Sequence, residues 1–402
     1  MKEFIKKFLP SFVLNWYHLG LAFLGALLYQ FPSKKLKVIG ITGTNGKTTV
    51  TEMITKIFEK AGFKVALINS IRFKIDEKEW RNTLRMTMPG RFFIQRFLKM
   101  AFVNKCQYAI LEVTSEGIKQ YRHKFINFEI AVFTNLSKEH IEAHGGFENY
   151  RKAKGELFKI TKNTHIINID DEHAKYFLQF TAKKKITYGL NRGEINNKNL
   201  QLKLKLIGNF NIHNALAAIS VGISQGIPLE VCKKNLEEIR EIPGRMEEVV
   251  SEPFKVIVDY AFTPNALEKV YKTVRKEFNP KKMVCVLGAC GGGRDKWKRP
   301  VLGEIAAKYC NEVIVTNEDP YDENPMQIIE QVAAGTRGKA RKILDRREAI
   351  KTALTIANEG DVVIITGKGC EPCICVAKGK RIPWDDRKVV KEEFEKIKNE
   401  EI

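Results

Sequence analysis

The sequence lacks the features that would assign it to several large classes of protein. It contains no internal repeat and no low-complexity segment, which argues against a repeat array or a disordered chain. It also has no helix-turn-helix cue, no RNA-binding signature and no zinc-finger spacing, although its net charge is +21. Because much of that excess comes from scattered lysines, we expect solvated basic faces and a phosphorylated or carboxylated small-molecule ligand, not a nucleic acid.

The sequence also lacks the paired cysteine spacings of a disulfide framework. Its eight cysteines are spread along the chain, which favours free thiols in a reducing compartment such as the cytoplasm. The one cluster is Cys370-Glu-Pro-Cys373-Ile-Cys375. A metal site there would need a fourth ligand, for which Cys290 is the candidate, so free thiols and a metal site both remain open.

The first segment, residues 1–36, is unusually apolar. Residues 8–31 have lysines on both sides, and no small-residue cleavage site stands out. Asn15, His18 and Gln30 interrupt the run, and spanning a bilayer takes about 20 apolar residues. We therefore expect a short apolar helix that lies on the inner face of a membrane, with the rest of the chain in the cytoplasm. The alternative is a helix packed on the catalytic core.

The chain is organised around a glycine-rich loop that follows this segment. Lys37–Ile41 is apolar and β-branched, as in a buried strand, and Val50–Ala61 has apolar residues at helical spacing. Between them lies Thr42-Gly-Thr-Asn-Gly-Lys-Thr-Thr49. Strand, glycine-rich loop and helix form the context that a phosphate-binding loop requires.

The residues of this loop suit a nucleotide triphosphate. Gly43 and Gly46 allow a tight turn that points N–H groups inward, and the helix N-terminus adds partial positive charge. Lys47 can reach the β and γ phosphates, and the Thr48 hydroxyl can take a Mg²⁺ position. The usual motif has a glycine where this chain has Ile41, so the loop is a variant.

At 402 residues the chain should hold two or three domains, and alternating strand and helix patterns predict their class. In residues 37–242 this alternation predicts an α/β domain with a mostly parallel, doubly wound sheet. The strands expected there are Lys37–Ile41, Lys64–Ile68, Tyr108–Val113, Ile130–Thr134, Thr164–Asn168, Lys185–Tyr188 and the half-exposed Leu200–Leu206.

After Pro243-Gly244 the alternation restarts, and we expect a second, smaller α/β domain over residues 243–402. The strands expected there are Val256–Asp259, Met283–Leu287, Glu312–Thr316 and Asp361–Thr366.

Polar residues follow several of these strands. Glu112 ends a buried strand, and an acid at that edge of a sheet, beside a phosphate-binding loop, usually holds Mg²⁺. Thr134 to His144 follows the next strand and contains two histidines and two glutamates. Gly291 to Arg299 is a glycine-rich, basic loop whose composition suits an anion; the alternative is a solvated basic turn.

Taken together, ten ordered stretches of the chain resemble the Mur ligases, ATP-dependent amide-bond ligases of peptidoglycan synthesis in the cell wall. The most similar branch is that of the UDP-N-acetylmuramoyl-tripeptide synthetases, and the resemblance covers about residues 37 to 390. The stretches are GTNGKTT at 43–49, EVTSEGIKQYR at 112–122, TNLSKEHIEAHG at 134–145, YRKAKGELF at 150–158, GNFNIHNALAA at 208–218, PGRMEEV at 243–249, VDYAFTPNALE at 258–268, GGGRDKWKRP at 291–300, TGKGCE at 366–371 and IPWDDR at 382–387.

The resemblance implies a central ATP-binding domain and a C-terminal Rossmann-like domain that closes over it. It assigns ATP to the loop residues Gly43, Thr44, Asn45, Gly46, Lys47, Thr48 and Thr49, and to Asn135, Asn214, Arg245 and Asp259. It assigns catalysis and two Mg²⁺ sites to Lys47, Thr48, Glu112, His140 and Lys154, of which Lys154 matches the lysine that the family carbamylates. It assigns the muramoyl peptide to Ser115, Gln120 and Arg122, and the incoming amino acid to Arg299, Gly367 and Glu371.

The chain departs from the family pattern at several positions, and the acceptor substrate is therefore open. We expect the protein to lack the usual N-terminal domain that grips the uridine diphosphate, with residues 1–36 in its place. The other departures are Glu116, Glu139, Glu142, Phe262, Cys370 and Tyr321, which stand where the family has His, Asp, Asp, His, His and the Arg of a DNPR motif.

The reaction implied has two steps: a peptide carboxylate attacks the ATP γ-phosphate, and the incoming amine then attacks the acyl phosphate. We expect a monomer. One alternative is another ligase of the superfamily, such as a folylpolyglutamate or cyanophycin synthetase. The other is a membrane-anchored nucleotide-binding scaffold without catalysis.

Tyr321 bears on which amino acid is added. In diaminopimelate-adding members the Arg of the DNPR motif clamps the distal carboxylate, and a tyrosine cannot replace that fork in kind. With Arg299 on the α-carboxylate, the acidic Glu318, Asp319 and Glu371 would favour lysine or ornithine. The alternative is that Arg294 or Lys298 supplies the clamp for diaminopimelate.

Overall fold

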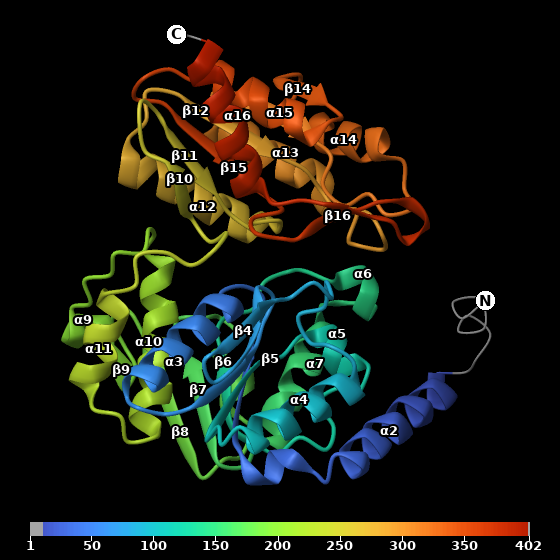
Figure 1. The fold of residues 1–402 in the computed structure, drawn as a ribbon, viewed down its shortest axis with the longest axis vertical. Coiled ribbons are helices and arrows are strands. Elements are labelled where there is room, and N and C mark those ends of the chain that lie inside the picture. Colours follow the sequence, from blue (N-terminus) through green and yellow to red (C-terminus); the bar gives the residue numbers. More distant parts are fainter. Residues whose placement is uncertain (1–10, 401–402) are drawn as a thin grey trace. The chain divides into compact units, whose positions relative to one another are not determined.

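The structure, a computed structural model, describes residues 11–400, which fold into two compact units (Figure 1). The first unit comprises the chain through Leu136, Glu148–Leu204 and Asn211–Glu238. The second comprises Ser137–Phe147, Lys205–Phe210 and the chain from Ile239 onward. The domain bounds at 36/37 and 242/243 remain predictions, and residues 1–10, including the start of the apolar run 8–31, lie outside the described part.

The first unit is built on a nine-stranded sheet in the order β4-β3-β2-β5-β1-β6-β7-β8-β9. Every pairing is parallel except those of β3 with β2 and β4, which are antiparallel. The strands are β1 Lys37–Thr42, β2 Val65–Ile68, β3 Arg72–Ile75, β4 Lys78–Arg81, β5 Tyr108–Glu112, β6 Phe128–Phe133, β7 Thr164–Asn168, β8 Lys184–Gly189 and β9 Ile195–Asn196.

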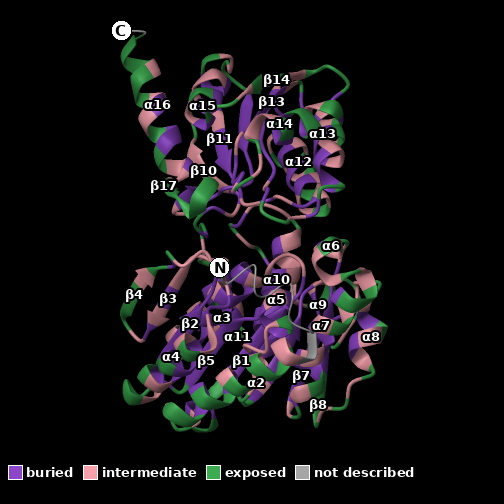
Figure 2. Cartoon of the chain, turned by 90° about the vertical axis from the view of Figure 1, so that its right-hand side faces the viewer, coloured by how far each residue is buried: buried purple, intermediate pink, exposed green. Residues whose placement is uncertain are grey.

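The central strands of this sheet are buried along nearly their whole length, because helices cover both faces (Figure 2). The helices of this part of the chain are α2 Ser11–Leu28, the 3-10 turn η1 Pro32–Lys35, α3 Lys47–Lys60, α4 Arg91–Val103, α5 Ser115–Lys119, α7 Phe147–Ile160, α8 Ala174–Leu178, α9 Asn197–Leu200, α10 Phe210–Ser224 and α11 Leu229–Glu237. The intervening α6, Ile141–His144, belongs to the second unit.

The N-terminal helix α2 packs against α4. Its small residues Ala22 and Ala26 are buried, and a Cβ at Gly25 would lie 3.6 Å from Phe92 and 3.7 Å from Gln95 of α4. Within residues 11–400, no helix is both long and apolar enough to cross a membrane.

The second unit has a six-stranded sheet in the order β10-β11-β15-β12-β13-β14, in which only the β10–β11 pairing is antiparallel. The strands are β10 Glu247–Val250, β11 Lys255–Val258, β12 Met283–Leu287, β13 Glu312–Thr316, β14 Ala340–Ile343 and β15 Val362–Ile365, with a separate ribbon of β16 Cys373–Cys375 and β17 Arg381–Pro383. The helices are α12 Pro264–Phe278, α13 Lys298–Tyr309, α14 Pro325–Ala334, α15 Arg346–Thr355, the 3-10 turn η2 Ala377–Gly379 and α16 Asp386–Glu400.

Side chains of this second sheet alternate between two hydrophobic cores. Cys285 and Leu287 of β12 face the core formed with α12, α13 and α14. Val284 and Val286 of the same strand face the core formed with α15 and α16. The sheet is therefore covered on both faces, as a doubly wound fold requires. The predicted class, α/β with mostly parallel sheets in both halves and a short apolar N-terminal helix, is confirmed.

One predicted strand is wrong. The stretch Leu200–Leu206 ends the short helix α9 and continues without regular structure, because Asn197 accepts a bond from the Leu202 amide and Gln201 adopts a left-handed conformation. The hairpin β3–β4 was not predicted; its turn is made by Asp76, which has a positive φ of 52°. Alternation over four residues is too short a signal to separate a strand from a loop.

The second unit depends on a buried ion pair between α15 and α16, which supports a stability prediction. Arg346 donates to both carboxylate oxygens of Asp386 at 2.8 and 2.7 Å, and both side chains are almost fully buried. Replacing Arg346 with alanine leaves that carboxylate buried and unpaired, so we expect a loss of about 3–5 kcal/mol in the free energy of unfolding. Urea unfolding of the full chain measures it.

The adjacent Arg347 provides the matched control. Its side chain is 40% exposed and pairs with the half-buried Glu392 and the buried Glu393. Glu393 also pairs with Lys396 at 2.8 Å, so it keeps a cationic partner when Arg347 is removed. Arg347→Ala should cost less than about 1 kcal/mol. Equal losses in the two variants would show that burial of the Arg346 pair does not matter.

Candidate active site

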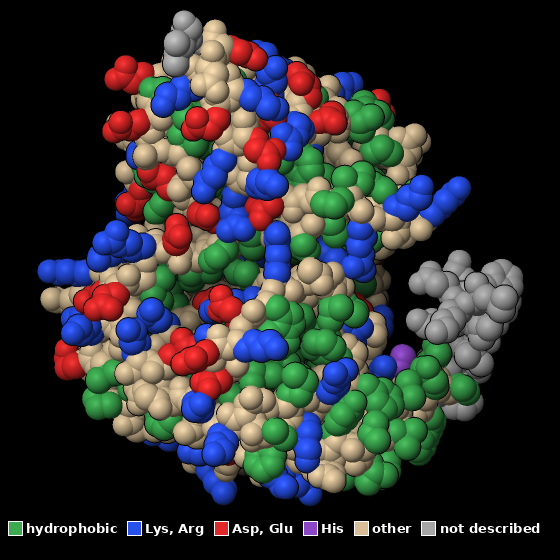
Figure 3. Space-filling model, in the orientation of Figure 1, with side chains coloured by type: hydrophobic (Ala, Val, Ile, Leu, Met, Phe, Trp, Pro, Cys, Tyr) green, Lys and Arg blue, Asp and Glu red, His purple; other side chains and the backbone are tan. Residues whose placement is uncertain are grey.

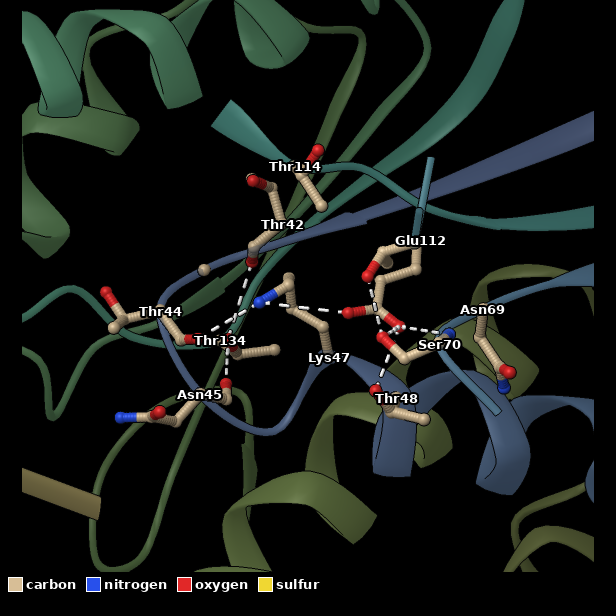
Figure 4. Close-up of polar contacts among 12 residues, drawn as sticks. Thr42, Thr44, Asn45, Lys47, Thr48, Asn69, Ser70, Glu112, Thr114 and Thr134 are labelled. Atoms are coloured by element: carbon tan, nitrogen blue, oxygen red, sulfur yellow. Dashed lines mark hydrogen bonds and ion pairs between the residues drawn. The ribbon is translucent and has the colours of Figure 1, made fainter. Parts of the chain in front are cut away.

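Polar side chains gather where the central strands of the first unit end. Strands β5, β1 and β6 are neighbours, so Glu112 at the end of β5, Thr42 at the end of β1 and Thr134 just after β6 meet at one edge (Figure 4). Ser70 comes from the loop after β2, the next strand of the sheet. In an open parallel sheet this carboxyl edge is where ligands bind.

Two glycines shape the loop between β1 and α3. Gly43 has a φ of 152°, and a Cβ there would lie 1.9 Å from the Thr134 hydroxyl. Gly46, the N-cap of α3, has a φ of 82°, and a Cβ there would lie 2.4 Å from the side-chain oxygen of Asn214. Both positions therefore exclude any other residue, for reasons of conformation and of space.

The segment after β6 holds this loop from one side. The Thr44 amide donates to the Asn135 carbonyl at 2.8 Å, and the Asn45 amide donates to the Asn135 side chain at 2.9 Å. The Asn135 amide group donates back to the Asn45 carbonyl at 3.0 Å, and the Thr134 hydroxyl donates to the same carbonyl at 2.7 Å. In the structure Asn135 therefore orders the loop that was predicted to bind phosphates.

Glu112 is the centre of the polar cluster beside the loop. Its carboxylate accepts from the Thr48 hydroxyl at 2.9 Å and from the Ser70 amide and hydroxyl, each at 3.2 Å. The Lys47 ammonium lies 3.8 Å from the other carboxylate oxygen and donates to the Thr44 carbonyl at 3.0 Å. The predicted group of Lys47, Thr48 and Glu112 is thus brought together.

Lys154 lies on the other side of the same loop. From α7 its ammonium donates to the Gly43 carbonyl at 2.7 Å, and it lies 4.6 Å from the centre of the Tyr150 ring. Burial, with the nearby Lys47 ammonium, holds the pKa of Lys154 well below its usual range. A larger fraction of this amine is therefore neutral and nucleophilic than in an exposed lysine.

The donor set at this edge fits a nucleotide with a hard divalent cation. The Glu112 carboxylate and the hydroxyls of Thr48 and Ser70 are oxygen ligands of the kind that Mg²⁺ prefers. The hydroxyl of Thr42 is buried beside them and has no hydrogen-bond partner. A bound Mg²⁺ would neutralise the Glu112 carboxylate, and phosphate oxygens would accept hydrogen bonds from the hydroxyls and the Lys47 ammonium.

His140, predicted to serve a second Mg²⁺, belongs to the second unit. It precedes α6 in the segment Ser137–Phe147, which is attached there by buried contacts. Asp295 accepts from the amides of Ile141 and Glu142, each at 3.0 Å, and Lys298 forms a buried ion pair with Glu139 at 2.7 Å. Contacts within the second unit therefore hold the segment that carries His140, and its role at a second Mg²⁺ stays a prediction.

The two predicted nucleotide contacts of the second unit lie close together. The carboxylate of Asp259 is buried and accepts from the amides of Met246 and Ala261 at 2.8 and 2.7 Å. Its pKa is raised by burial. The guanidinium of Arg245 lies 4.4 Å from the centre of the Tyr260 ring. Asn214, the remaining predicted contact, faces Gly46 in the first unit and donates to Asn211 at 3.0 Å.

The residues predicted for the amino acid belong to two polar groups of the second unit. Arg299 is buried and donates to the Cys290 carbonyl at 3.1 Å and to Glu323 at 2.9 Å. The Cys290 thiol donates to Glu318 at 2.8 Å, and Glu318 packs against Gly367.

Lys368 is the centre of the second polar group. Its ammonium is buried between Asp319 at 2.8 Å and Glu371 at 2.6 Å. Glu371 also accepts from the Tyr260 hydroxyl at 2.9 Å.

The residues predicted for the muramoyl peptide lie along α5 and just beyond it. Ser115 begins α5 and is buried, and Gln120 accepts from the Arg122 guanidinium at 2.7 Å. Arg122 also donates to the Met88 carbonyl. Its pKa is lowered by burial and by the nearby Arg91.

Three residues of the site were not singled out from the sequence. Ser70 follows β2, and β2 lies next to β5, which ends at Glu112. The sequence does not give this strand order, so it could not indicate that Ser70 lies beside Glu112. Thr134 and Tyr150 lie within stretches that resemble the family, but without an assigned role. The Tyr150 hydroxyl bonds Thr44 at 3.0 Å.

The cysteine cluster does not form a metal site in the part of the chain that the structure describes. All eight cysteines lie in residues that the structure describes, and none of them forms a disulfide. In residues 11–400, no three His, Cys, Asp or Glu side chains are grouped as metal ligands would be.

Comparison with known proteins decides the family. Residues 41–222 match the model of the Mur ligase middle domain, and residues 244–369 match that of the Mur ligase glutamate ligase domain. The chain belongs to the Mur ligase family. The resemblance inferred from the sequence motifs is confirmed, as is the assignment to the ligases.

Similar relatives of this Mur ligase include proteins named as diaminopimelate ligases and one named as a tripeptide synthetase. A UDP-N-acetylmuramoyl-L-alanyl-D-glutamate–2,6-diaminopimelate ligase of Syntrophomonas wolfei is 39% identical over 401 residues, covering 93% of this chain and 81% of the relative. A UDP-N-acetylmuramyl-tripeptide synthetase of Roseiflexus sp. is 34% identical, covering 91% of this chain and 80% of the relative. A solved diaminopimelate ligase superposes with a TM-score of 0.60 at 29% identity, covering 90% of this chain and 79% of that one.

A more distant structure supports the fold alone. The Mycobacterium tuberculosis folylpolyglutamate synthase in complexes with ADP and AMPPCP superposes with a TM-score of 0.70 at 18% identity, covering 87% of this chain and 92% of that one. The family uses ATP and Mg²⁺ in general, which agrees with the donor set described above.

The geometry of the loop supports a prediction for Gly46. Alanine there would meet both the positive φ and the Asn214 side chain, so we expect Gly46→Ala to lose at least about 1–2 kcal/mol of stability and most of its affinity for ATP. A fluorescent ATP analogue titrated into the folded protein measures the affinity.

Gly62, just beyond the other end of α3, is the matched control. Its φ is 86°, but a Cβ there meets no atom within 4 Å. Gly62→Ala should lose similar stability and keep its ATP affinity. If Gly46→Ala also kept its affinity, the loop would not hold the nucleotide.

Proposed function

We propose that this Mur ligase adds an amino acid to a UDP-N-acetylmuramoyl peptide, or to a related carboxylate, with ATP and Mg²⁺, in peptidoglycan precursor synthesis. The observation that carries the proposal is the convergence of Lys47, Thr48, Glu112 and Lys154 on the glycine loop. The names of the similar relatives supply the substrate class, a UDP-muramoyl dipeptide.

In this proposal the loop residues bind and neutralise ATP. The amides of the first turn of α3 and the Lys47 ammonium face the phosphates, so that negative charge on the transferred phosphoryl group is stabilised where it develops. Bound Mg²⁺ supplies further charge neutralisation, held by Thr48 and Glu112, with Ser70 as an additional oxygen ligand. Asn135 and Asn214 contact adenine, and Arg245 and Asp259 contact the nucleotide from the second unit.

The reaction forms one carbon–nitrogen bond at the cost of one phosphoanhydride bond. A carboxylate oxygen of the acceptor bonds to the γ-phosphorus, and ADP leaves with the electrons of the broken bond. The amine then bonds to the acyl carbon, loses a proton, and releases phosphate. Ser115, Gln120 and Arg122 orient the acceptor carboxylate for the first step, and Arg299, Gly367 and Glu371 orient the amine for the second.

Lys154 is proposed to be carbamylated. Its lowered pKa leaves a neutral amine that can attack carbon dioxide, and the resulting carbamate would be an anionic oxygen ligand for a second Mg²⁺ together with His140.

The added amino acid is proposed to be basic, lysine or ornithine. One carboxylate oxygen of Glu318 accepts from Cys290, but the other is buried and has no hydrogen-bond partner. A distal ammonium would supply that partner, whereas the distal carboxylate of diaminopimelate would add repulsion. Arg299 already donates to three protein groups, so a clamp for a second carboxylate would have to come from Arg294 or Lys298.

We further propose that the protein is a cytoplasmic monomer that touches the inner face of a membrane through residues 8–31 and does not bind nucleic acid. The apolar outer side of α2 supports this contact.

The function is tested by ADP release with UDP-muramoyl dipeptide and a panel of lysine, ornithine and diaminopimelate. We expect kcat/KM to be highest for lysine or ornithine, since specificity is that ratio. Lys47→Ala should lower the rate by about 10²–10³-fold, because the lysine stabilises developing charge. A preference for diaminopimelate would refute the proposal that the added amino acid is lysine or ornithine. Activity with folates alone would favour the alternative of a folylpolyglutamate synthetase. No ADP release with any acceptor would favour a nucleotide-binding scaffold without catalysis.

Lys154→Ala should lower the rate by at least about 10–100-fold, because the proposed carbamate orients a metal ion. Acetate, a small carboxylate, should partly restore the activity of this variant when added to the assay. Lys152 is an exposed lysine of the same helix, so Lys152→Ala should match the unchanged protein with or without acetate. Full activity of Lys154→Ala would show instead that this lysine only supports the Gly43 carbonyl.

A further inference from the structure

Exposed hydrophobic side chains are concentrated on α2 and α4 of the first unit. Nine of the fourteen large hydrophobic residues that are exposed in the described chain lie on these two helices: Trp16, Tyr17, Phe23, Leu24, Leu27, Leu28, Phe92, Met100 and Val103. Figure 3 shows hydrophobic side chains gathered where α2 lies, at the lower right of the view. We refer to these nine residues as the α2–α4 face.

This face belongs to a helix that is anchored on its other side. Ala22 and Ala26 are buried against α4, and the Ser33 hydroxyl just after α2 donates to the Phe125 carbonyl and accepts from the Asn127 amide. The helix is therefore fixed to the unit while presenting apolar residues outward. An exposed apolar patch of this kind marks an interaction site.

The charges on the two chain segments that carry the face have one sign. Residues 11–36 contain Lys34 and Lys35, residues 91–105 contain four lysines or arginines, and neither stretch contains an aspartate or glutamate. Lys35 and Lys99 lie over the Phe102 ring, 4.8 and 5.9 Å from its centre, which places their charges beside the end of α2. Apolar residues with Trp and Tyr, bordered by lysines, are the composition of a helix that lies in the interface of an anionic membrane.

The α2–α4 face is connected to the residues proposed for the muramoyl peptide. The guanidinium of Arg91, the first residue of α4, lies 2.5 Å from the His18 ring nitrogen of α2 and also donates to the Gln120 carbonyl. The side chain of Gln120 in turn accepts from Arg122. One polar network thus links α2 directly to the acceptor-binding stretch, within a single unit.

We propose that the α2–α4 face rests on an anionic lipid surface and that the acceptor is a muramoyl peptide held in that membrane by a lipid carrier. The inference rests on the proposed ligase function and concerns the acceptor of the same site. A muramoyl peptide carries a diphosphate whether uridine or a lipid is attached, and a basic border suits that group in both cases. The apolar face beside the acceptor residues selects the lipid-linked form.

Membrane binding is tested with the full chain and vesicles of phosphatidylglycerol and phosphatidylcholine in equal parts. The protein should sediment with these vesicles, less with phosphatidylcholine alone, and less at high salt. Leu24→Glu with Leu27→Glu, both at positions 53% exposed, should stay in the supernatant. Leu344→Glu is the control, since Leu344 is 46% exposed in the second unit and should not alter sedimentation.

Acceptor choice is tested by ADP release with two muramoyl dipeptides, one linked to a lipid carrier in the same vesicles and one linked to uridine diphosphate in solution. The lipid-linked acceptor should have the higher kcat/KM. The Leu24→Glu, Leu27→Glu variant should lose on the order of tenfold with it and nothing with the soluble acceptor.

The outcomes separate this inference from the proposed function. Equal or better use of the soluble acceptor, or a protein that does not sediment with anionic vesicles, overturns the inference and leaves the ligase function standing. ADP release with neither acceptor overturns both. If the double variant also fails to release ADP with the soluble acceptor, it has lost more than membrane contact. The single variant Trp16→Glu, at a position 72% exposed, then replaces it once circular dichroism shows that this variant is folded. Loss of its activity with the lipid-linked acceptor alone supports the inference, and unchanged activity with both acceptors overturns it.

Discussion

The close approach of two backbone segments at Gly43 is the constraint on which the active site depends. The loop after β1 is pressed against Thr134 and Asn135 after β6, without room for a Cβ atom at Gly43. Once the two segments meet, four hydrogen bonds between residues 44–45 and residues 134–135 hold the loop in one conformation. Lys154 then reaches the Gly43 carbonyl from α7. These contacts within the protein restrict the conformation of the loop, which reduces the entropy lost when a nucleotide binds.

Buried charges have a comparable role in the second unit, where several strand ends and loops converge. Lys368 between Asp319 and Glu371, Arg346 on Asp386 and Lys298 on Glu139 are all buried and paired. Such pairs contribute little net stability compared with apolar residues, but each is costly to break. They consequently fix the relative positions of the loops that were predicted to surround the amino acid. Glu318, with one oxygen left without a partner, is the exception, which makes it a candidate ligand residue.

The N-terminal helix combines the two interpretations that the sequence left open. Its small residues pack on α4, as expected for a helix attached to the catalytic core, while its large residues face outward, as expected for a helix on a membrane surface. The two descriptions concern opposite sides of the same helix. A pattern of small residues on one side and large apolar residues on the other is visible in the sequence, but which side is covered depends on the surface of α4.

The sequence by itself determined the family and the α/β class with mostly parallel sheets, and it predicted a phosphate-binding role for the central loop. These follow from local signals: buried strands read as continuous apolar runs, and a strand–glycine loop–helix pattern has few other uses. The stretch Leu200–Leu206 was wrongly predicted as a strand, and the hairpin β3–β4 was missed, because four to seven residues carry too little periodicity.

Only the tertiary structure decided which residues share a site. Strand order β5-β1-β6, with β2 next to β5, places Glu112, Thr134 and Ser70 at one edge although they are far apart in the sequence. It likewise assigned His140 to the second unit, because Asp295 and Lys298 attach its segment there. Burial gave Lys154 its lowered pKa, and no sequence pattern reports burial of one lysine among sixty-eight basic residues.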